Sequence, residues 1–516
     1  MSDPTITSYE EVPFDSGPVT NSHPDSLATV ATLYGLRPPR LEGCRVLELG
    51  CSTGGNLLGM ALSLPEGSFV GIDLSPRQIA HARVLADRLG LTNVELRAMS
   101  IADVDGELGT FDYIVCHGVY SWVPEPIRDA ILRVCSRNLS PRGVAFVSYN
   151  TFPGWHARAM VREMIVFHDD PTRPPMERVA RGREFVEFLA RCASMPMSVY
   201  RAVFERELHA IRSMSDSHFL HEELEAVNQP VYFADFARLA ATNGLHCLAE
   251  AGLSAAEALL PPEVRVPLRE WSADAVQHEQ YLDFVRDRAF RQTLLCHADA
   301  RVTAAPTADV MPALYIAARA APITAAADPA ADVAEEFRSP DGRVVNTNHP
   351  LLRAALHVLF ESLPHALPFG ELWARVRDRA PAAVQFMDAD DEGRTLASGM
   401  LQCAMGHLIG LHVRPAPCAA DAGPRPTASP LARVQATVGE RVTNLRHFSV
   451  DLLAFDRAVV PFLDGTRDRP ALLSVVRDAV ERGDISTDDG APTLPDLSLA
   501  LDASLRRLAG SALLIA

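Results

Sequence analysis

Residues 41–150 alternate strongly apolar runs with amphipathic stretches, and this alternation limits the possible folds more than any other feature of the 516-residue chain. The apolar runs are CRVLELG, GSFVGIDL, NVELRAM, TFDYIVCHG and GVAFVSYN. The stretch SPRQIAHARVLADRLG has apolar residues at helical spacing, begins with an N-cap serine and a proline, and stops at Gly90. Strands that alternate with helices form a parallel sheet wrapped by helices. The sequence therefore predicts an α/β domain built on these five strands.

Beyond Thr151 the chain becomes mostly helical. Residues 156–225 are rich in Arg and Glu and show no strand pattern, whereas 227–253 give a helix, a glycine stop and a strand. A helix followed by a strand is the next unit expected in an open α/β sheet, so 156–225 is predicted to be a helical insertion in the first domain. The predicted divisions are an N-terminal segment at 1–40, a first domain at 41–255, a middle domain at 256–335 and a C-terminal domain at 336–516.

The C-terminal region is the least distinctive part of the sequence. Short helices separated by turns follow His349 and suggest a winged-helix-like module. A Pro/Ala-rich stretch at 414–430 is predicted to be a linker.

Charge and composition narrow the choice of partners. The chain has 48 basic and 65 acidic residues, which gives a net charge of −17. Binding to nucleic acid needs clustered positive charge, so we expect no nucleic-acid partner. Every basic residue is arginine, and the sequence contains no lysine. A GC-biased genome explains this bias, which also suits an enzyme that modifies lysine without modifying itself.

Cysteine spacing bears on metal binding, and hydropathy bears on membrane insertion and export. The nine cysteines are scattered without a C-x-x-C pair or zinc-like spacing, so no metal site is predicted. No run approaches the roughly 18 apolar residues that a membrane helix needs. The polar, acidic N-terminus also lacks the pattern of a signal peptide. We therefore expect a cytoplasmic protein with no membrane insertion.

The first apolar run leads into the glycine-rich turn ELGCSTGGN, which is typical of a nucleotide-type cofactor site. Asp73 closes the second strand 23 positions after Gly50 and could bind two ribose hydroxyls of NAD or of S-adenosylmethionine. A dinucleotide fingerprint needs glycine where this chain has Ser52, because the backbone must approach a pyrophosphate. S-adenosylmethionine has no phosphate, so the turn favours this cofactor. Asp73→Ala should then weaken cofactor binding, and Ser52→Gly should cost little.

The same region resembles class I S-adenosylmethionine-dependent methyltransferases through four successive motifs. These are ELG followed by Gly54, GIDLSPRQIAHAR, AMSIAD and FDYIVCHGV. Two departures are Ser52 and Ser100, the latter where the family often has an acid near the adenine amine, and Asp103 could replace that acid. The resemblance, together with an N-terminal segment that is expected to cover the cofactor, implies these cofactor-binding residues: Tyr9, Glu48, Gly50, Cys51, Ser52, Gly54, Asn56, Asp73, Leu74, Ser100, Ile101, His117 and Gly118.

A narrower resemblance extends over most of the chain. The segments SYEEVPF, HGVYSWVP, YNTFPGW, HEELEAVNQPVYFADF and FRQTLL are similar to bacterial methyltransferases that carry a methyltransferase regulatory domain. That group includes rickettsial outer-membrane-protein lysine methyltransferases. The resemblance implies a Rossmann-like catalytic domain, an inserted dimerisation region, a middle domain and a C-terminal domain, and hence a possible homodimer. Tyr9, Pro13 and Phe14 are too apolar for a free tail and predict a lid over the cofactor.

Acceptor-binding groups are expected at the carboxyl ends of the fourth and fifth strands, beside the cofactor. These ends read CHGVYSWVP and SYNTFPGWH. Aromatic rings could hold an amine by cation–π attraction worth about 0.5–2 kcal/mol per ring, although large rings also serve as core. A side-chain amide could accept a hydrogen bond from a substrate N–H. The candidate catalytic residues are Tyr120, Trp122, Tyr149, Asn150 and Trp155.

The predicted function is methyl transfer from S-adenosylmethionine to a lysine side-chain nitrogen of a protein. One alternative is O- or N-methylation of a small secondary metabolite, with the additional domains shaping a pocket. Another is a non-catalytic protein that senses S-adenosylmethionine, which the departures at Ser52 and Ser100 suggest.

Overall fold

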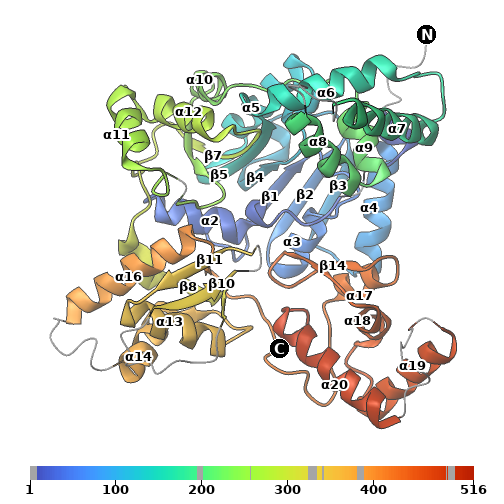
Figure 1. Cartoon of the computed structure of the whole chain (residues 1–516), viewed down its shortest axis with the longest axis vertical. Coiled ribbons are helices and arrows are strands. Elements are labelled where there is room, and N and C mark those ends of the chain that lie inside the picture. The colour runs from blue at the N-terminus through green and yellow to red at the C-terminus, as the bar shows by residue number, and fades with distance from the viewer. Residues whose placement is uncertain are drawn as a thin grey trace.

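The protein is described by a computed structural model, with a seven-stranded central sheet and two smaller lobes below it in Figure 1. The residues that the structure describes are 8–14, 16–193, 201–255, 257–323, 334–339, 342–380, 389–483, 485 and 494–516. None of the helices in these ranges is both long and apolar enough to cross a bilayer.

The central sheet has the strand order β3-β2-β1-β4-β5-β7-β6. Its first five strands are parallel, and β7 runs antiparallel to both β5 and β6. The predicted Rossmann-like sheet is therefore confirmed. The strands are β1 Arg45–Leu49, β2 Ser68–Asp73, β3 Val94–Ala98, β4 Phe111–Cys116, β5 Leu139–Asn150, β6 Leu245–Glu250 and β7 Phe290–His297.

Strand β7 comes from a part of the chain that the sequence places in the middle domain. It lies between β5 and β6 in the sheet, so a domain boundary at residue 255 would assign strands of one sheet to two different domains. The helices α11 (Pro262–Trp271) and α12 (Ala275–Arg286) separate β6 from β7 in the chain. Because two helices separate β6 from β7, no local sequence pattern shows that the chain returns to the sheet. The other predicted divisions stay predictions.

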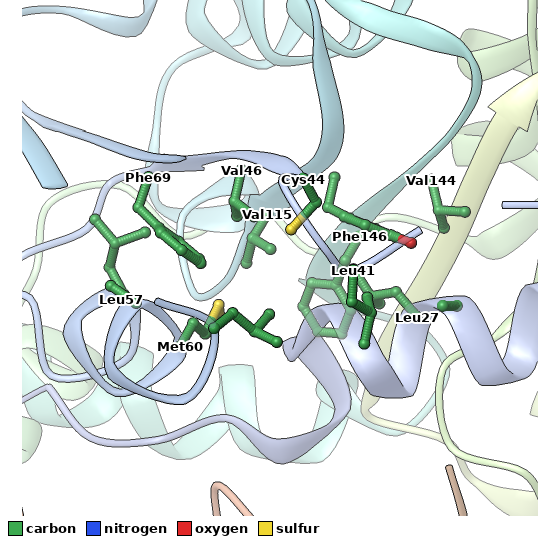
Figure 2. Packing of buried hydrophobic residues seen from close by; sticks show 14 of the residues in the cluster. Leu27, Leu41, Cys44, Val46, Leu57, Met60, Phe69, Val115, Val144 and Phe146 are labelled. Atoms are coloured by element: carbon green, nitrogen blue, oxygen red, sulfur yellow. The ribbon is translucent and has the colours of Figure 1, made fainter. Parts of the chain in front are cut away.

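Helices cover both faces of the sheet, which explains why its strands are almost continuously apolar. One face packs on α2 (Pro24–Leu33), α3 (Leu57–Ser63) and α4 (Pro76–Arg88), and the other on α5 (Glu125–Arg137) and α10 (Phe233–Thr242). Figure 2 shows the first of these cores, where side chains from the helices meet those of the sheet. Its labelled residues are Leu27, Leu41, Cys44, Val46, Leu57, Met60, Phe69, Val115, Val144 and Phe146.

The predicted helical insertion is also present. It consists of α6 Trp155–His168, α7 Pro175–Ala193, α8 Arg201–Ser213 and α9 Asp216–Glu223. These helices share a core of their own, which includes Val161, Ile165, Val186 and Phe219. Short elements complete the first part of the chain. They are α1 Ser8–Glu11, η1 Thr20–Ser22, η2 Ile101–Asp103, η3 Gly106–Leu108 and η4 Tyr120–Trp122.

The first of the two lower lobes, yellow to orange in Figure 1, contains two three-stranded sheets. Its strands are β8 Tyr315–Ala318, β9 Ala321–Pro322, β10 Glu335–Arg338, β11 Val344–Thr347, β12 Leu367–Pro368 and β13 Ile409–His412. Its helices are η5 Ala308–Ala313, α13 Pro350–Glu361, α14 Phe369–Arg379 and α16 Ala389–Met405. Together they enclose one apolar core around Ile316, Leu359 and Met400.

The last lobe, orange to red in Figure 1, is built from short helices and one hairpin. Its elements are α17 Pro430–Ala436, β14 Arg441–Thr443, β15 Ser449–Asp451, α18 Ala454–Val459, η6 Val460–Phe462, α19 Arg469–Glu481 and α20 Leu494–Gly510. The stretch 414–430, predicted to be a linker, instead packs on this lobe. Cys418 pairs with Ile515 and Ala428 with Leu514, because the last residues of the chain return to it.

Candidate functional site

The glycine turn after β1 is shaped by three residues with positive φ. Gly50, Ser52 and Gly54 have φ values of 74°, 51° and 81°. The amide nitrogens of Gly50 and Cys51 donate to the Ile72 carbonyl at 2.8 and 3.0 Å, so the turn is bound to the end of β2. A side chain at Gly50 would place its Cβ 2.5 Å from Val119 Cγ2. Glycine is therefore required here both by the backbone angle and by the close approach of the chain after β4.

Asp73, at the end of β2, is held in a fixed orientation by N–H donors. Ser52 N donates to its Oδ2 and Ser75 N to its Oδ1, both at 2.9 Å. The side chain of Gln78 also donates to Oδ1, at 3.3 Å. Burial raises the pKa of Asp73, and these hydrogen bonds oppose that shift by favouring the carboxylate. The carboxylate oxygens keep lone pairs for further donors, which suits the predicted binding of ribose hydroxyls.

Glu48 supplies a buried oxygen that lacks a donor. Its Oε1 accepts a hydrogen bond from Asn56 Nδ2 at 2.7 Å, whereas its Oε2 has no partner among the described residues. Burial raises the pKa of Glu48 to about 8. A buried carboxyl oxygen without a donor is costly. The amino group of the methionine part of S-adenosylmethionine is a donor of the right kind, so the residues present fit this cofactor.

The region expected to bind the adenine contains an exposed apolar side chain, Leu74, and a hydroxyl, that of Ser100, which already accepts a hydrogen bond. Leu74 is 58% exposed directly after Asp73, although its side chain is apolar. The Ser100 hydroxyl accepts a hydrogen bond from Ala102 N at 3.2 Å and thereby begins η2. Ile101 is buried beneath this turn, and Asp103 is exposed. The predicted adenine contacts of Ser100 and Ile101 stay predictions.

The N-terminal segment crosses the glycine turn. Phe14 N donates to Gln78 Oε1 at 3.1 Å, and Ser52 Oγ lies 3.1 Å from Phe14 O. Gly55 N donates to Ser16 Oγ at 2.8 Å, and a Cβ at Gly55 would lie 2.1 Å from the Ser16 carbonyl oxygen. The segment therefore rests directly on the backbone of the turn, and its role as a lid over the cofactor stays a prediction.

The same segment also contacts the helical insertion. The Tyr9 ring stacks on His221 of α9 with ring centroids 4.2 Å apart. His221 is hydrogen-bonded to the Val12 carbonyl through Nε2 at 2.8 Å. Tyr9 thus ties the N-terminal segment to the insertion, and its predicted contact with the cofactor stays a prediction.

His117 lies at the carboxyl end of β4 in a largely enclosed position. Its Nδ1 is 3.1 Å from Ser148 Oγ, which also accepts a hydrogen bond from Gly118 N at 2.8 Å. Burial lowers the pKa of His117 to about 4, so the ring is neutral at physiological pH. The Phe290 ring meets it edge-on with centroids 6.2 Å apart.

Phe290 belongs to the site although the sequence analysis did not single it out. It pairs with Asn150 across β5 and β7 and is 41% exposed. Asn150 is itself buried, and its Nδ2 has no partner among the residues that the structure describes. His117, Asn150 and Phe290 therefore lie together at the carboxyl end of the parallel strands. The only sequence signal for Phe290 is its place in the segment FRQTLL.

Two of the predicted catalytic rings are core residues, which corrects the expectation of an amine-binding cage around them. Tyr120 and Tyr149 are each 1% exposed, and both pack on Phe236 of α10, with centroids 5.3 and 4.2 Å away. The Tyr149 hydroxyl lies 2.9 Å from Thr293 Oγ1. Strand alternation turns Tyr149 toward the face covered by α10, so neither ring offers a face to a ligand.

Trp122 and Trp155 remain candidates with reduced access. Their rings meet edge-on with centroids 6.4 Å apart, and Trp155 is buried. The Arg158 guanidinium lies 4.7 Å from the centroid of the Trp155 ring. A cation already occupies this ring, so Trp155 has less capacity to bind a substrate amine.

Comparison with known proteins identifies three parts of the chain. Residues 41–167 match a methyltransferase domain, 215–297 match a predicted methyltransferase regulatory domain, and 424–513 match the C-terminal winged-helix domain of PKMT. The winged-helix module is thus the last lobe, and the earlier lobe that follows His349 lies outside this match.

Two relatives cover nearly the whole chain. An uncharacterized protein of Rickettsia prowazekii is 31% identical over 484 residues, which are 93% of this chain and 87% of the relative. The structure of PKMT2 from Rickettsia typhi in complex with AdoHcy superimposes with a TM-score of 0.86 at 27% identity and covers 98% of this chain and all of that one. A ubiquinone biosynthesis O-methyltransferase of Xanthomonas axonopodis is 35% identical over 140 residues, 25% of this chain and 56% of its own.

AdoHcy, S-adenosylhomocysteine, is what remains of S-adenosylmethionine after methyl transfer. The full-length likeness to a protein that binds it, together with Asp73 and the unpaired oxygen of Glu48, identifies S-adenosylmethionine as the cofactor. The protein is an S-adenosylmethionine-dependent methyltransferase, and it belongs to the family of class I methyltransferases that carry a methyltransferase regulatory domain and a PKMT-type winged-helix domain.

Proposed function

We propose that this methyltransferase acts on the side-chain nitrogen of lysine residues in a protein substrate. The observation that carries the proposal is the likeness to PKMT2, which extends over 98% of the chain and includes the insertion and both lower lobes. PKMT denotes a protein lysine methyltransferase. A likeness restricted to the first domain would support methyl transfer alone.

The groups named at the carboxyl end of the parallel strands are uncharged and do not oppose a cationic acceptor. S-adenosylmethionine supplies the electrophilic methyl group when it is bound. His117 is neutral at physiological pH because its pKa is about 4, so it does not repel an approaching lysine. Phe290 offers an exposed ring nearby, which can attract an ammonium group by cation–π interaction. The overall charge of −17 also favours encounter with lysine-rich proteins.

Asn150 is the residue that we assign to orienting the acceptor. Its amide is buried at the end of β5, and its Nδ2 lacks a partner among the described residues. An amide oxygen accepts a hydrogen bond from an amine N–H, so Asn150 Oδ1 can hold the acceptor amine in line while the amine lone pair stays free to attack the methyl group. We infer that Trp122 assists from the loop after β4, where it is half-buried.

A small-molecule acceptor is the competing function. The likeness to a ubiquinone biosynthesis O-methyltransferase supports it, but that likeness covers a quarter of the chain. It leaves the helical insertion and the two lower lobes without a role. The lysine proposal accounts for them as surfaces that a polypeptide contacts.

We also propose that the protein is a cytoplasmic homodimer that associates through the helical insertion. Phe167 at the end of α6 is 90% exposed, and Val166, Met176 and Phe188 on α6 and α7 are also exposed. The helices α6 and α7 contact each other, and exposed apolar side chains that gather on neighbouring helices are typical of an interface. Phe167→Glu should give a monomer in analytical ultracentrifugation. An unchanged sedimentation coefficient would contradict this assignment.

The acceptor class is tested by following labelled methyl groups. The protein is incubated with tritiated S-adenosylmethionine and a bacterial lysate, and the label is measured separately in the protein and small-molecule fractions. We expect the label in protein for the wild type, and a large decrease for Asn150→Ala. Label confined to small molecules would reject the lysine proposal in favour of the alternative.

A further inference from the structure

The hairpin turn between β14 and β15 of the winged-helix domain rests on the first turn of α3. His447 lies at this turn in a left-handed conformation with φ of 61°, and its side chain is buried. Its Nε2 lies 2.8 Å from Asn56 Oδ1, and Thr20 Oγ1 donates to its carbonyl oxygen at 2.7 Å. Figure 1 shows the lobe's β14 and α17 next to α3. A residue of the last domain thus contacts the cofactor turn of the first.

The Asn56 amide has all four of its hydrogen-bonding positions filled by protein groups. Val19 N donates to Oδ1 at 2.8 Å, which fixes that atom as the acceptor. The Nδ2 donates to Ser22 Oγ at 3.0 Å and to Glu48 Oε1 at 2.7 Å. The fourth position is the contact with His447, whose Nε2 must therefore carry the hydrogen. Asn56 was predicted to bind the cofactor, but its amide has no capacity left for a direct contact.

The fold provides space for this imidazole ring at one position of α3. A Cβ added at Gly59 would lie 2.9 Å from His447 Cε1 and 3.0 Å from its Nδ1. Any larger residue at position 59 would have to displace the His447 ring, so glycine is what allows the ring to lie against α3. The His23 ring lies on another side, with centroids 5.2 Å apart. The contact is therefore fitted to a histidine in both shape and hydrogen bonding.

Through Asn56, the hydrogen bond from His447 is connected to the carboxyl group of Glu48. Glu48 Oε1 is held by Asn56, and Glu48 Oε2 is a buried oxygen without a partner in the described part of the chain. If the Asn56 amide rotates, the Glu48 carboxyl loses the only side-chain donor that it has among the described residues, and the Leu57 backbone amide alone is left to orient it. A group that fixes the amide thus fixes Oε2 as well.

We propose that His447 is a positioning residue for cofactor binding. Its Nε2–H holds the Asn56 amide, which aims Glu48 Oε2 at the amino group of S-adenosylmethionine. Docking of the winged-helix domain therefore sets the cofactor affinity of the first domain. The inference concerns the cofactor alone and does not require lysine to be the acceptor.

The test is the dissociation constant of S-adenosylhomocysteine, measured by calorimetry on the full-length protein. His447→Ala should weaken binding about five- to tenfold, as expected for the loss of one buried hydrogen bond. His447→Gln restores an N–H donor of similar reach and should bind within about twofold of the wild type. Gly59→Ala should weaken binding like His447→Ala because it displaces the ring, although alanine favours the helix.

A control separates this role from general stability. Val476→Ala removes buried contacts of α19, within the core of the winged-helix domain, and should lower the melting temperature without changing the dissociation constant. A folded His447→Ala protein with wild-type affinity would overturn the proposal. Equal weakening by Val476→Ala would overturn it too, because domain stability would then explain the effect.

Two further outcomes are distinguishable. If His447→Ala does not fold, Gly59→Ala decides, and wild-type affinity in that variant would overturn the proposal. If no lysine becomes methylated while the affinities shift as described, the acceptor assignment fails and the role of His447 is supported.

Discussion

Substitution of Ser52 by glycine and by alanine separates two effects that the structure gives to this residue. The backbone of Ser52 has φ of 51°, a conformation that costs a residue with a side chain roughly 1–2 kcal/mol. The hydroxyl donates to Gln78 Oε1 at 2.7 Å and lies 3.1 Å from Phe14 O, and such a bond contributes about 1 kcal/mol net. Glycine removes both the strain and the hydroxyl, whereas alanine removes only the hydroxyl.

The two variants should therefore differ in stability and agree in cofactor binding. Ser52→Ala should lower the free energy of unfolding by about 1 kcal/mol, and Ser52→Gly should leave it within about 1 kcal/mol of the wild type, since relief of strain offsets the lost bond and the added chain entropy. Both release Gln78, which orients Asp73, and Phe14 of the predicted lid. Both should weaken S-adenosylhomocysteine binding about fivefold, the equivalent of about 1 kcal/mol.

Chemical denaturation and calorimetry measure these quantities. The sequence alone predicts that Ser52→Gly costs little, because it shows no contact of the hydroxyl. Wild-type affinity in Ser52→Gly would refute the assigned role of the hydroxyl. A glycine variant that is less stable than the alanine variant would refute the argument from backbone strain.

Three further outcomes are expected. Asp73→Ala should weaken S-adenosylhomocysteine binding about 10- to 100-fold in calorimetry, because a charged acceptor of hydrogen bonds is lost; a change below twofold would contradict ribose binding by Asp73. Burial raises the pKa of Glu48 in the cofactor-free protein from 4.5 to about 8. The folded protein therefore binds this proton more tightly than the unfolded protein does. As a result, the contribution of Glu48 to the free energy of unfolding falls as the pH rises from about 4.5 to about 8. At pH 7 the cationic amino group of the cofactor should expel this proton, so the binding enthalpy should differ between phosphate and Tris buffers for the wild type and not for Glu48→Gln; equal heats for the wild type would contradict the pairing. Tyr149→Phe should lower stability by about 1 kcal/mol through the lost contact with Thr293 and leave kcat/KM within about twofold; a large loss of kcat in steady-state kinetics would restore Tyr149 to the catalytic set.

The parts of the site that lie within one βα unit could be predicted from the sequence. Gly50 and Gly54 have the backbone angles that the turn requires, and Asp73 ends its strand beside them. Local spacing determines these relations, so a single sequence reveals them. The five parallel strands followed from the same kind of local pattern.

The parts that depend on distant segments could not be predicted. Tyr149 looked available because it ends a strand, but the face that it occupies is decided by α10. Phe290 reaches the site through an antiparallel strand that follows about 140 residues after β5, and His447 is 391 residues from Asn56. Tertiary packing, which no local periodicity encodes, brings these groups together.

The most direct test of the central claim is the chemical position of the transferred methyl group. The protein is incubated with deuteromethyl-labelled S-adenosylmethionine and the protein fraction of a bacterial lysate, and tryptic peptides are sequenced by tandem mass spectrometry. We predict deuterated methyl groups on lysine Nε with the wild type, and strongly reduced labelling with Asp73→Ala at a cofactor concentration near the wild-type dissociation constant. Label on other residues, or on small molecules alone, would contradict the assignment of this protein as a lysine methyltransferase.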